Sequence, residues 1–336
     1  METPYKVICL TPVRNEAWIL PTFLTAASLW ADVIIVADQG STDGSVEISK
    51  SFEKVILIHN TSGDYSEAGR QLMLISAARN YPSPRILVAL DADEFLSPSI
   101  VSPSWFGRLL ANGPGAYARV PFFNVKPGLN HGWVGHTNFI AAWVDNNRPH
   151  FPDLIHSQRL PVSHDDPIVV PQSGAVVMHW QFVAPARMRS KHRWYMVWER
   201  LNRPERSAVH IYRQYHHMYA IKRSELKSVP VGWLKWYEER GVKLAEIMDD
   251  GRHWWDSDVL SQIAKHGAGH FSREAIWSHD WQRSAGLVGL KSPEGFADSR
   301  TVGEKLAHIW LRSTQRWQSW FLVRAGDRIL RSIWNH

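Results

Sequence analysis

The segment Arg85-Ile-Leu-Val-Ala-Leu-Asp-Ala-Asp-Glu-Phe-Leu96 decides the fold. Residues 86–90 form an unbroken apolar run, which is typical of a strand buried on both faces of a parallel sheet. The run ends in three acids, Asp91, Asp93 and Glu94. In an extended backbone the first two point the same way, about 6–7 Å apart, and can share one cation or polar ligand. Glu94 alternates away from this pair and is expected to pack or cap. The alternative interpretation of the whole segment is a solvated strand end.

Strands and helices alternate before this segment. Short apolar runs predict strands at residues 5–10, 33–37 and 55–58, and apolar residues at helical spacing predict helices over 16–30, 44–53 and 65–80. This alternation, with buried runs of four to six residues, predicts an α/β fold in which crossover helices flank a mostly parallel sheet.

Polar clusters follow three of the predicted strands, at residues 11–16, 38–45 and 91–94. The carboxyl ends of parallel strands share one edge of the sheet, so we expect the three clusters to converge there. That edge is where open α/β sheets bind their ligands. The sequence therefore predicts one ligand crevice built from all three clusters.

These clusters resemble motifs of a known enzyme family. Thr11-Pro-Val-Arg-Asn-Glu16, Asp38-Gln-Gly-Ser-Thr-Asp-Gly-Ser45 and Leu90-Asp-Ala-Asp-Glu94 look like the N-terminal half of a family 2 glycosyltransferase, similar to those of bacterial cell-surface polysaccharide or lipopolysaccharide synthesis. The resemblance covers residues 5–125 and extends weakly to about residue 200. It implies a GT-A fold, followed in this chain by a helical, Trp-rich C-terminal extension.

The resemblance implies a site for a nucleotide-diphosphate sugar, with a UDP-sugar as the expected donor. The donor-binding residues that it implies are Thr11, Pro12, Arg14, Asn15, Glu16, Asp38, Arg70 and Asp91. Family members usually carry a second acid where this chain has Gln39, which leaves Asp38 alone to read the base. The alternative interpretation of Arg70 is a solvated arginine on a helix.

The resemblance also implies a divalent cation, Mn²⁺ or Mg²⁺, held by Asp91 and Asp93. Carboxylate oxygens suit both ions, and a bound cation would offset charge on the leaving nucleoside diphosphate. His179 ends the apolar run 176–178 and is the candidate third ligand. A histidine whose hydrogen bonds are satisfied in the core is the alternative.

An inverting transfer needs a general base to deprotonate the acceptor hydroxyl. The candidates are Asp165 and Asp166, in Ser163-His-Asp-Asp-Pro167. They follow Gln158-Arg-Leu160, which resembles an Arg-Leu segment before a His–acid pair in lipopolysaccharide-type members. An ordinary turn before the proline is the alternative.

Composition limits the other classes of function. The chain has 336 residues with 38 basic and 32 acidic side chains, a net charge of +6, which is too modest to indicate a nucleic-acid partner. Its one cysteine, Cys9, lies in an apolar run, so a buried thiol is expected and an internal disulfide is excluded. We find neither a signal-peptide pattern nor a membrane-spanning run, and expect a cytoplasmic protein, or one peripheral at the inner face of the membrane.

Tryptophan usage divides the chain near residue 130, because 15 of the 18 tryptophans lie at or after Trp133. We expect a nucleotide-sugar-binding half at 1–125, an acceptor-side half at 126–225 and a mainly helical basic region at 226–336. The last segment, 303–336, is expected to be helical with a break at Gly326. Its basic residues and apolar stripe suit a helix lying on anionic lipid, although packing on its own domain or on a partner chain is the alternative.

The sequence thus predicts a metal-dependent, inverting glycosyltransferase that moves a sugar from a nucleotide donor to a glycan or lipid-linked acceptor. A nucleotidyltransferase is disfavoured because its glycine-rich, arginine-bearing first loop is missing. The alternative from another class is a catalytically inactive sugar-nucleotide-binding or scaffold protein, in which the Trp-rich half serves as the interaction surface.

Overall fold

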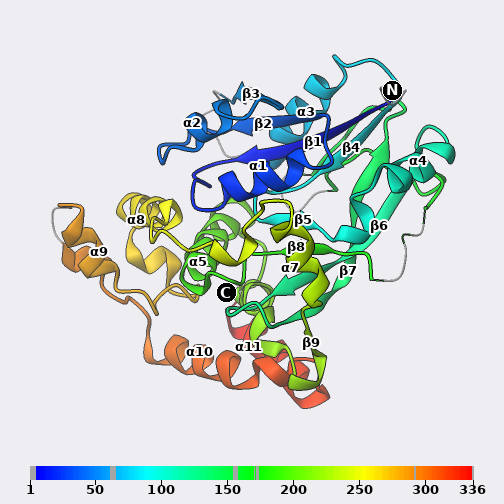
Figure 1. The fold of residues 1–336 in the computed structure, drawn as a ribbon. Helices are drawn as coiled ribbons and strands as arrows, with labels where there is room; N and C mark the ends of the chain where they lie inside the picture. The colour runs from blue at the N-terminus through cyan, green and yellow to red at the C-terminus, as the bar shows by residue number, and fades with distance from the viewer. Residues whose placement is uncertain are drawn as a thin grey trace. The chain divides into compact units, whose positions relative to one another are not determined.

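The computed structural model describes residues 5–60, 66–153, 158–169, 171, 174–290 and 293–334. Contacts divide the chain into two compact units (Figure 1). The first unit contains residues 1–184 and 227–250, and the second contains residues 185–226 and 251–336. The chain therefore passes between the units three times, at 184/185, 226/227 and 250/251.

The first unit is built on one mixed sheet. Its strands are β1 (Lys6–Val13), β2 (Val33–Asp38), β3 (Val55–His59), β4 (Arg85–Ala89), β5 (Glu94–Leu96), β6 (Tyr117–Val125), β7 (His131–Val144), β8 (Val177–His179) and β9 (Leu226–Ser228). The order is β3-β2-β1-β4-β7-β6-β8-β5, with β9 paired to β7. β1 pairs in parallel with both β2 and β4, and β2 pairs in parallel with β3. The predicted parallel sheet is therefore confirmed for the first four strands, and antiparallel pairing enters at β7.

Helices cover both faces of the parallel strands. The helices of this unit are α1 (Leu20–Ser28), α2 (Ser45–Lys50), α3 (Glu67–Ala78), α4 (Pro103–Ala111) and α7 (Val231–Glu238), with short 3-10 turns η1 (Pro98–Ile100) and η4 (Leu244–Glu246). Alternate residues of β1 explain the two layers, because Val7 and Cys9 pack in the cluster that contains Phe23 of α1, whereas Ile8 packs with Ile75 of α3. Cys9 is fully buried, as expected.

Residues 227–250 return to the first unit and pack beside β5. The hydroxyl of Tyr237 in α7 is buried and donates to the Leu96 carbonyl at 2.7 Å. Its ring also lies edge-on to Phe95, with the ring centroids 6.4 Å apart. One buried tyrosine thus ties this late segment to the strand that follows the acidic residues.

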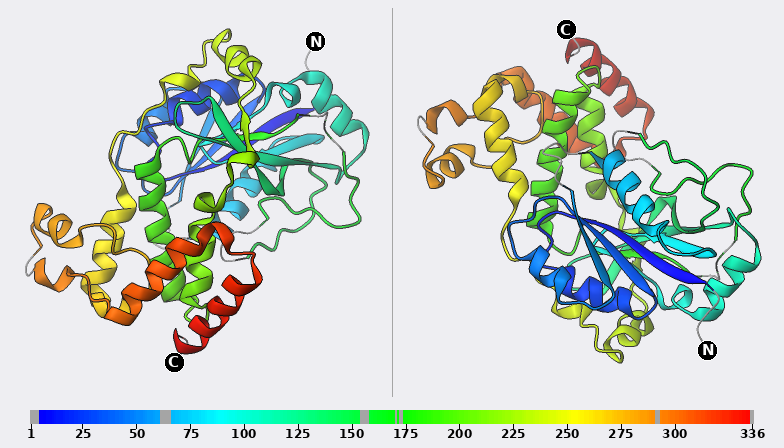
Figure 2. Two further views of the ribbon diagram at one scale, coloured as in Figure 1. Left: turned by 90° about the horizontal axis from the view of Figure 1, so that it is seen from below. Right: turned by 90° about the horizontal axis from the view of Figure 1, so that it is seen from above.

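The second unit is helical. It contains α5 (Pro185–Asn202), α6 (Ala208–Tyr215), η2 (His217–Ala220), η3 (Arg223–Glu225), α8 (Trp254–His266), η5 (Ala268–Phe271), α9 (Trp281–Leu287), η6 (Pro293–Phe296), α10 (Val302–Thr314), η7 (Gln315–Trp317) and α11 (Phe321–Trp334). Figure 2 shows α10 and α11 alongside the α5–α6 pair. In the described ranges, no helix is both long enough and apolar enough to cross a membrane.

The helical break predicted at Gly326 is wrong. Gly326 lies inside α11, and the break falls at residues 315–320 between α10 and α11. A Cβ atom added at Gly326 would meet Trp310 Cζ2 at 2.5 Å, so this glycine allows the two helices to approach each other. Residues 335–336 of the predicted segment lie outside the described residues.

Candidate functional site

The loops that follow β1 and β2 are joined by hydrogen bonds. The backbone N–H of Asn15 donates to Ser41 Oγ at 2.9 Å, and the Asn15 side-chain Oδ1 accepts from the Thr42 N–H at 2.7 Å. The N–H of Glu16 donates to Ser45 Oγ at 3.0 Å. These bonds bring residues 14–17 and 41–45 together at the carboxyl end of the parallel strands, where convergence was predicted.

Two buried oxygens at this edge make no hydrogen bond within the described part of the chain. Asp38 Oδ2 accepts from the N–H groups of Gly40 (3.1 Å) and Ser41 (3.2 Å), whereas Asp38 Oδ1 is buried without a partner. Thr11 Oγ1, fully buried on the neighbouring strand, also lacks one. Buried polar atoms are normally paired, so these two oxygens are candidates to bind a polar ligand.

The acids after β4 form a turn instead of continuing the strand. The N–H of Glu94 donates to the Asp91 carbonyl at 3.0 Å, and the Glu94 side-chain Oε2 accepts from the Asp91 N–H at 3.0 Å. The extended spacing expected for Asp91 and Asp93 is therefore wrong, because the side chain of Glu94 closes the turn. Glu94 caps the Asp91 N–H, one of the two roles expected for it, but its side chain does not point away from the other acids, because it shares Arg159 with Asp91 and lies in one group with Asp93.

Arg159 holds this turn from outside. Its guanidinium donates to both oxygens of Glu94 (2.6 and 2.9 Å) and to Asp91 Oδ2 (2.8 Å), and it lies 4.7 Å from the centroid of the Phe139 ring. Burial raises the pKa of the Glu94 carboxyl, against the opposing effect of the Arg159 charge. One guanidinium, which the sequence did not single out for this role, therefore hydrogen-bonds both carboxylates and offsets one of their two negative charges.

Strand register brings His179 to the same place. In the pairing of β5, β8 and β6, His179 is opposite Glu94 on one side and Asn124 on the other. The N–H of Trp180 donates to the Asp93 carbonyl at 2.8 Å, which extends this pairing by one residue. The Nδ1 atom of His179 lies 3.0 Å from Asn124 Oδ1, and Nε2 lies 3.7 Å from Asp93 Oδ2.

Asp93, Glu94 and His179 form a group that can hold a metal ion. Each offers one ligand atom, and these atoms lie within 4.8 Å of one another. Asp93 and His179 fit best, because both oxygens of Glu94 already accept hydrogen bonds from Arg159. The imidazole nitrogen favours Mn²⁺ over Mg²⁺, which takes oxygen ligands. Asp91 is outside this group, and its role as a ligand stays a prediction.

The other predicted donor-binding residues lie at or beside this edge. Pro12 is in β1, Arg14 follows it, and Glu16 accepts a hydrogen bond from Trp18 Nε1 at 2.7 Å. Arg70 is in the first turns of α3, the helix that follows β3.

Asp165 and Asp166 are not brought to this edge. Asp166 accepts two hydrogen bonds from Arg148 (2.7 and 3.0 Å) and one from the Ser163 N–H (2.7 Å), while Asp165 is exposed. The Arg148 carbonyl bonds to Arg79, which also pairs with Asp145 beside Arg85 at the start of β4.

Six residues of extended chain, about 20 Å, separate the start of β4 from Asp91. The candidate bases Asp165 and Asp166 are therefore separated from the acidic turn, and their role as the general base stays a prediction.

Comparison with known proteins identifies the N-terminal part of the chain. Residues 9–167 match the sequence profile described as glycosyl transferase family 2. This segment belongs to glycosyl transferase family 2. Its sheet and flanking helices form a GT-A fold. His179 lies beyond the matched family 2 segment, although the sheet places it beside the acids of that segment.

Similarity to solved structures is low. Glucosyl-3-phosphoglycerate synthase from Mycobacterium tuberculosis is 22% identical over 35% of this chain, with a TM-score of 0.24. A mycobacterial protein is 20% identical over 36% (TM-score 0.26), and 4-diphosphocytidyl-2C-methyl-D-erythritol synthase is 12% identical over 43% (TM-score 0.27). The chain spans 44%, 41% and 74% of the lengths of these three proteins, respectively.

Two residues that contact the acidic turn or His179 were not predicted as site residues from the sequence. Asn124 and Arg159 reach the acidic turn only through strand pairing and a loop far along the chain. Arg159 was noted only as part of a segment that precedes the candidate base. Neither has a local pattern that distinguishes it from other polar residues.

Proposed function

We propose that the protein is a metal-dependent, inverting glycosyltransferase that uses a nucleotide-diphosphate sugar, with a UDP-sugar as the expected donor. The acceptor would be a glycan or a lipid-linked saccharide. The observation that supports this most directly is the Asp93–Glu94–His179 group, in which the two acids belong to the family 2 segment and His179 lies beyond it.

In this proposal, different residues of the site bind the nucleoside and the metal ion. Asp38 Oδ1 and Thr11 Oγ1 are the buried oxygens available to hydrogen-bond the nucleoside. Asp93 and His179 would hold Mn²⁺, and Arg159 keeps Asp91 and Glu94 in place beside them. The cation, when bound, supplies Lewis-acid stabilisation of the leaving nucleoside diphosphate.

The test is a thermal-shift screen of nucleotide sugars with and without Mn²⁺, followed by transfer assays with the best donor. A donor that stabilises the protein only when Mn²⁺ is present is the expected result. Asp93→Asn should remove that metal-dependent stabilisation, whereas Glu53→Gln, at an exposed acid of the same unit, should keep it.

Two results would contradict parts of the proposal. Equal stabilisation by donors with and without Mn²⁺ would show that donor binding does not need the metal. Metal-dependent donor binding with neither transfer nor donor hydrolysis, over a broad set of acceptors, would favour the inactive sugar-nucleotide-binding protein.

A further inference from the structure

The exposed side chains of α10, η7 and α11 include many large apolar and aromatic groups. The α10–α11 face consists of Val302, Leu306, Ile309, Trp317, Trp320, Phe321, Leu322, Ile329 and Ile333, all of them exposed. Phe321 and Leu322 are 81% and 74% exposed at the start of α11. Large apolar side chains exposed together on a folded surface usually mark a binding site.

Helical spacing places the apolar side chains of α10 on its outer side. Val302, Leu306 and Ile309 recur at the spacing of one helical stripe. Ala307 and Leu311 point the other way and are buried in a small core with α6. The helix is thus apolar on its inner and outer sides, and only the inner side is covered within the described structure.

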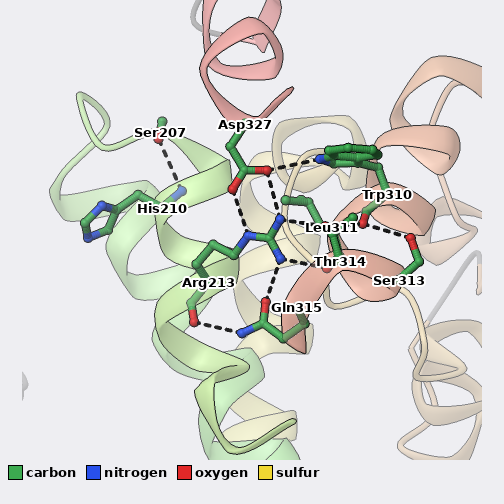
Figure 3. A network of polar contacts seen from close by, with 9 residues as sticks. All are labelled: Ser207, His210, Arg213, Trp310, Leu311, Ser313, Thr314, Gln315 and Asp327. Atoms are coloured by element: carbon green, nitrogen blue, oxygen red, sulfur yellow. Dashed lines mark hydrogen bonds and ion pairs between the residues drawn. The ribbon is translucent and has the colours of Figure 1, made fainter. Parts of the chain in front are cut away.

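An ion-pair network fixes α11 in place (Figure 3). Arg213 of α6 donates to both carboxylate oxygens of the buried Asp327, at 3.0 and 2.8 Å. The same guanidinium also donates to Leu311 O, Thr314 Oγ1 and Gln315 Oε1. Trp310 Nε1 donates to Asp327 Oδ1 at 3.0 Å, so both helices are held by their inner sides. The exposed residues of α10 and α11 are therefore carried by helices that these hydrogen bonds hold in fixed positions.

The charged residues of the α10–α11 segment are almost all positive, and Arg324 and Arg328 of α11 lie three and seven residues after Phe321, on the same side of the helix as that ring. The basic residues of this segment are Lys305, Arg312, Arg316, Arg324, Arg328 and Arg331. Its two acids are already engaged, because Glu304 bonds to Thr301 and Ser272, and Asp327 pairs with Arg213. Within the described ranges, none of the five arginines makes an ion pair.

Exposed apolar side chains together with unpaired arginines favour one kind of binding partner, an anionic lipid surface. A second copy of the same face would bring the same positive charge, so two copies would repel each other. Anionic phospholipid complements the arginines, and each basic residue near such a surface contributes favourably to binding. Tryptophan and phenylalanine beside arginine are also the side chains favoured at the membrane–water interface.

We propose that the α10–α11 face docks the protein on a membrane surface that contains anionic phospholipid. The exposed aromatic residues enter the headgroup region, and the arginines contact lipid phosphates. This interaction uses only the second unit and does not depend on the proposed reaction.

Sedimentation of the full-length protein with vesicles tests this directly. Vesicles of equal phosphatidylcholine and phosphatidylglycerol should bind the protein, pure phosphatidylcholine should bind it at least tenfold more weakly, and high salt should release it. Phe321→Ser with Leu322→Ser should weaken binding more than tenfold through lost apolar burial. Arg324→Gln with Arg328→Gln should weaken it about 30-fold, at about fivefold for each charge.

Matched control variants distinguish binding through this surface from nonspecific adsorption to vesicles. Met248→Ser removes a side chain that is 77% exposed elsewhere, and Lys265→Gln with Arg283→Gln removes two exposed charges outside the face. Both controls should bind vesicles as the wild type does. All these positions are exposed, so unchanged circular dichroism and thermal melting are expected and confirm folding.

Three outcomes would overturn the proposal. These are equal binding to neutral and anionic vesicles, equal loss of binding in the control variants, and absence of vesicle binding by the folded wild type. If Phe321→Ser with Leu322→Ser instead dissolves a dimer seen by analytical ultracentrifugation, the face binds a second copy and the lipid proposal is wrong.

Discussion

Asn124 Oδ1 accepts a hydrogen bond from His179 Nδ1 at 3.0 Å and thereby determines the orientation and tautomer of the histidine ring. Because the amide oxygen only accepts, Nδ1 carries the proton and Nε2 is left as a lone-pair donor. Nε2 lies 3.7 Å from Asp93 Oδ2, the oxygen with which it would share a cation. In the proposed metal site, the sheet register would thus prepare His179 as a ligand through Asn124, which would not itself touch the metal.

Asn124→Ala should weaken Mn²⁺ binding by about 10–100-fold, as loss of an outer partner of a metal-ligating histidine usually does. Titration calorimetry with Mn²⁺ alone measures this without any assay of transfer. Asn130→Ala, which changes an exposed asparagine of the same unit, is the control and should leave the affinity unchanged. Unchanged Mn²⁺ affinity in Asn124→Ala would show that His179 does not depend on this bond.

Arg159→Met should lower the free energy of unfolding by about 3–5 kcal/mol, because it leaves the buried Glu94 carboxylate without its partner. Adding Glu94→Gln to Arg159→Met removes the uncompensated charge and should restore part of the loss. Urea denaturation of the two single variants and the double variant measures the coupling. Arg108→Met, at an exposed arginine on α4, should change stability by no more than about 0.5 kcal/mol. Additive effects of the two changes would contradict the pairing.

Asp166→Asn should reduce stability by about 1–3 kcal/mol and leave Mn²⁺-dependent donor binding intact. Against the effect of partial burial, the Arg148 guanidinium holds the pKa of the Asp166 carboxyl below its usual range. The stability gained from this pair is present above the unfolded pKa, near 3.9, and is lost as the pH falls through the lower folded value. Denaturation across acidic pH measures it.

Asp165→Asn is the matched variant for the base assignment, because Asp165 is exposed beside Asp166. It should change stability by no more than about 0.5 kcal/mol, so transfer assays of this variant report on the role of Asp165 as the base and not on folding. Loss of transfer in either variant, with normal melting and normal donor binding, would support that residue as the general base.

His308 should make the second unit less stable in acid. Its Nε2 lies 3.0 Å from the Arg273 carbonyl and its Nδ1 lies 2.9 Å from Arg300 Nη1, so only the neutral ring with the proton on Nε2 suits both partners. Burial lowers the pKa of His308 to about 4. The unfolded chain, with a pKa near 6.5, binds more protons between these values, so stability falls as the pH drops through this window.

His308→Gln measures this contribution, since glutamine can donate to the same carbonyl and accept from the same arginine without titrating. We expect the variant to lose less stability than the wild type between about pH 7.5 and about pH 5, by on the order of 2 kcal/mol. Thermal melting at both pH values provides the comparison. Equal losses in the two proteins would assign the acid sensitivity to other groups, such as the buried His192, whose pKa burial also lowers.

The first half of the sheet could be predicted from the sequence because each of its strands is a short apolar run that can be recognised without reference to distant residues. The runs at 33–37 and 55–58 became β2 and β3 within one residue, and the polar loops after β1 and β2 meet as expected. Apolar strands and turn residues need no knowledge of distant segments to be recognised.

The geometry of the acidic residues could not be predicted in this way. The turn at Asp91 is closed by the side chain of Glu94 and held by Arg159, which is 65 residues later in the chain. The Gly326 break failed for the same kind of reason, since glycine normally weakens a helix and here admits the Trp310 ring instead. Both features depend on contacts between residues far apart in the chain, and nothing in the sequence indicates that these residues meet.

The three passages of the chain between the units limit how the molecule can be divided. A single proteolytic cut at 184/185, 226/227 or 250/251 always leaves at least one unit split between two fragments. Loss of residues 303–336 would remove Leu311 and Trp334, which share a core with Val209 of the earlier helix α6. The helical unit therefore cannot be exchanged between proteins as a C-terminal cassette, and a functional chimera requires two coordinated replacements.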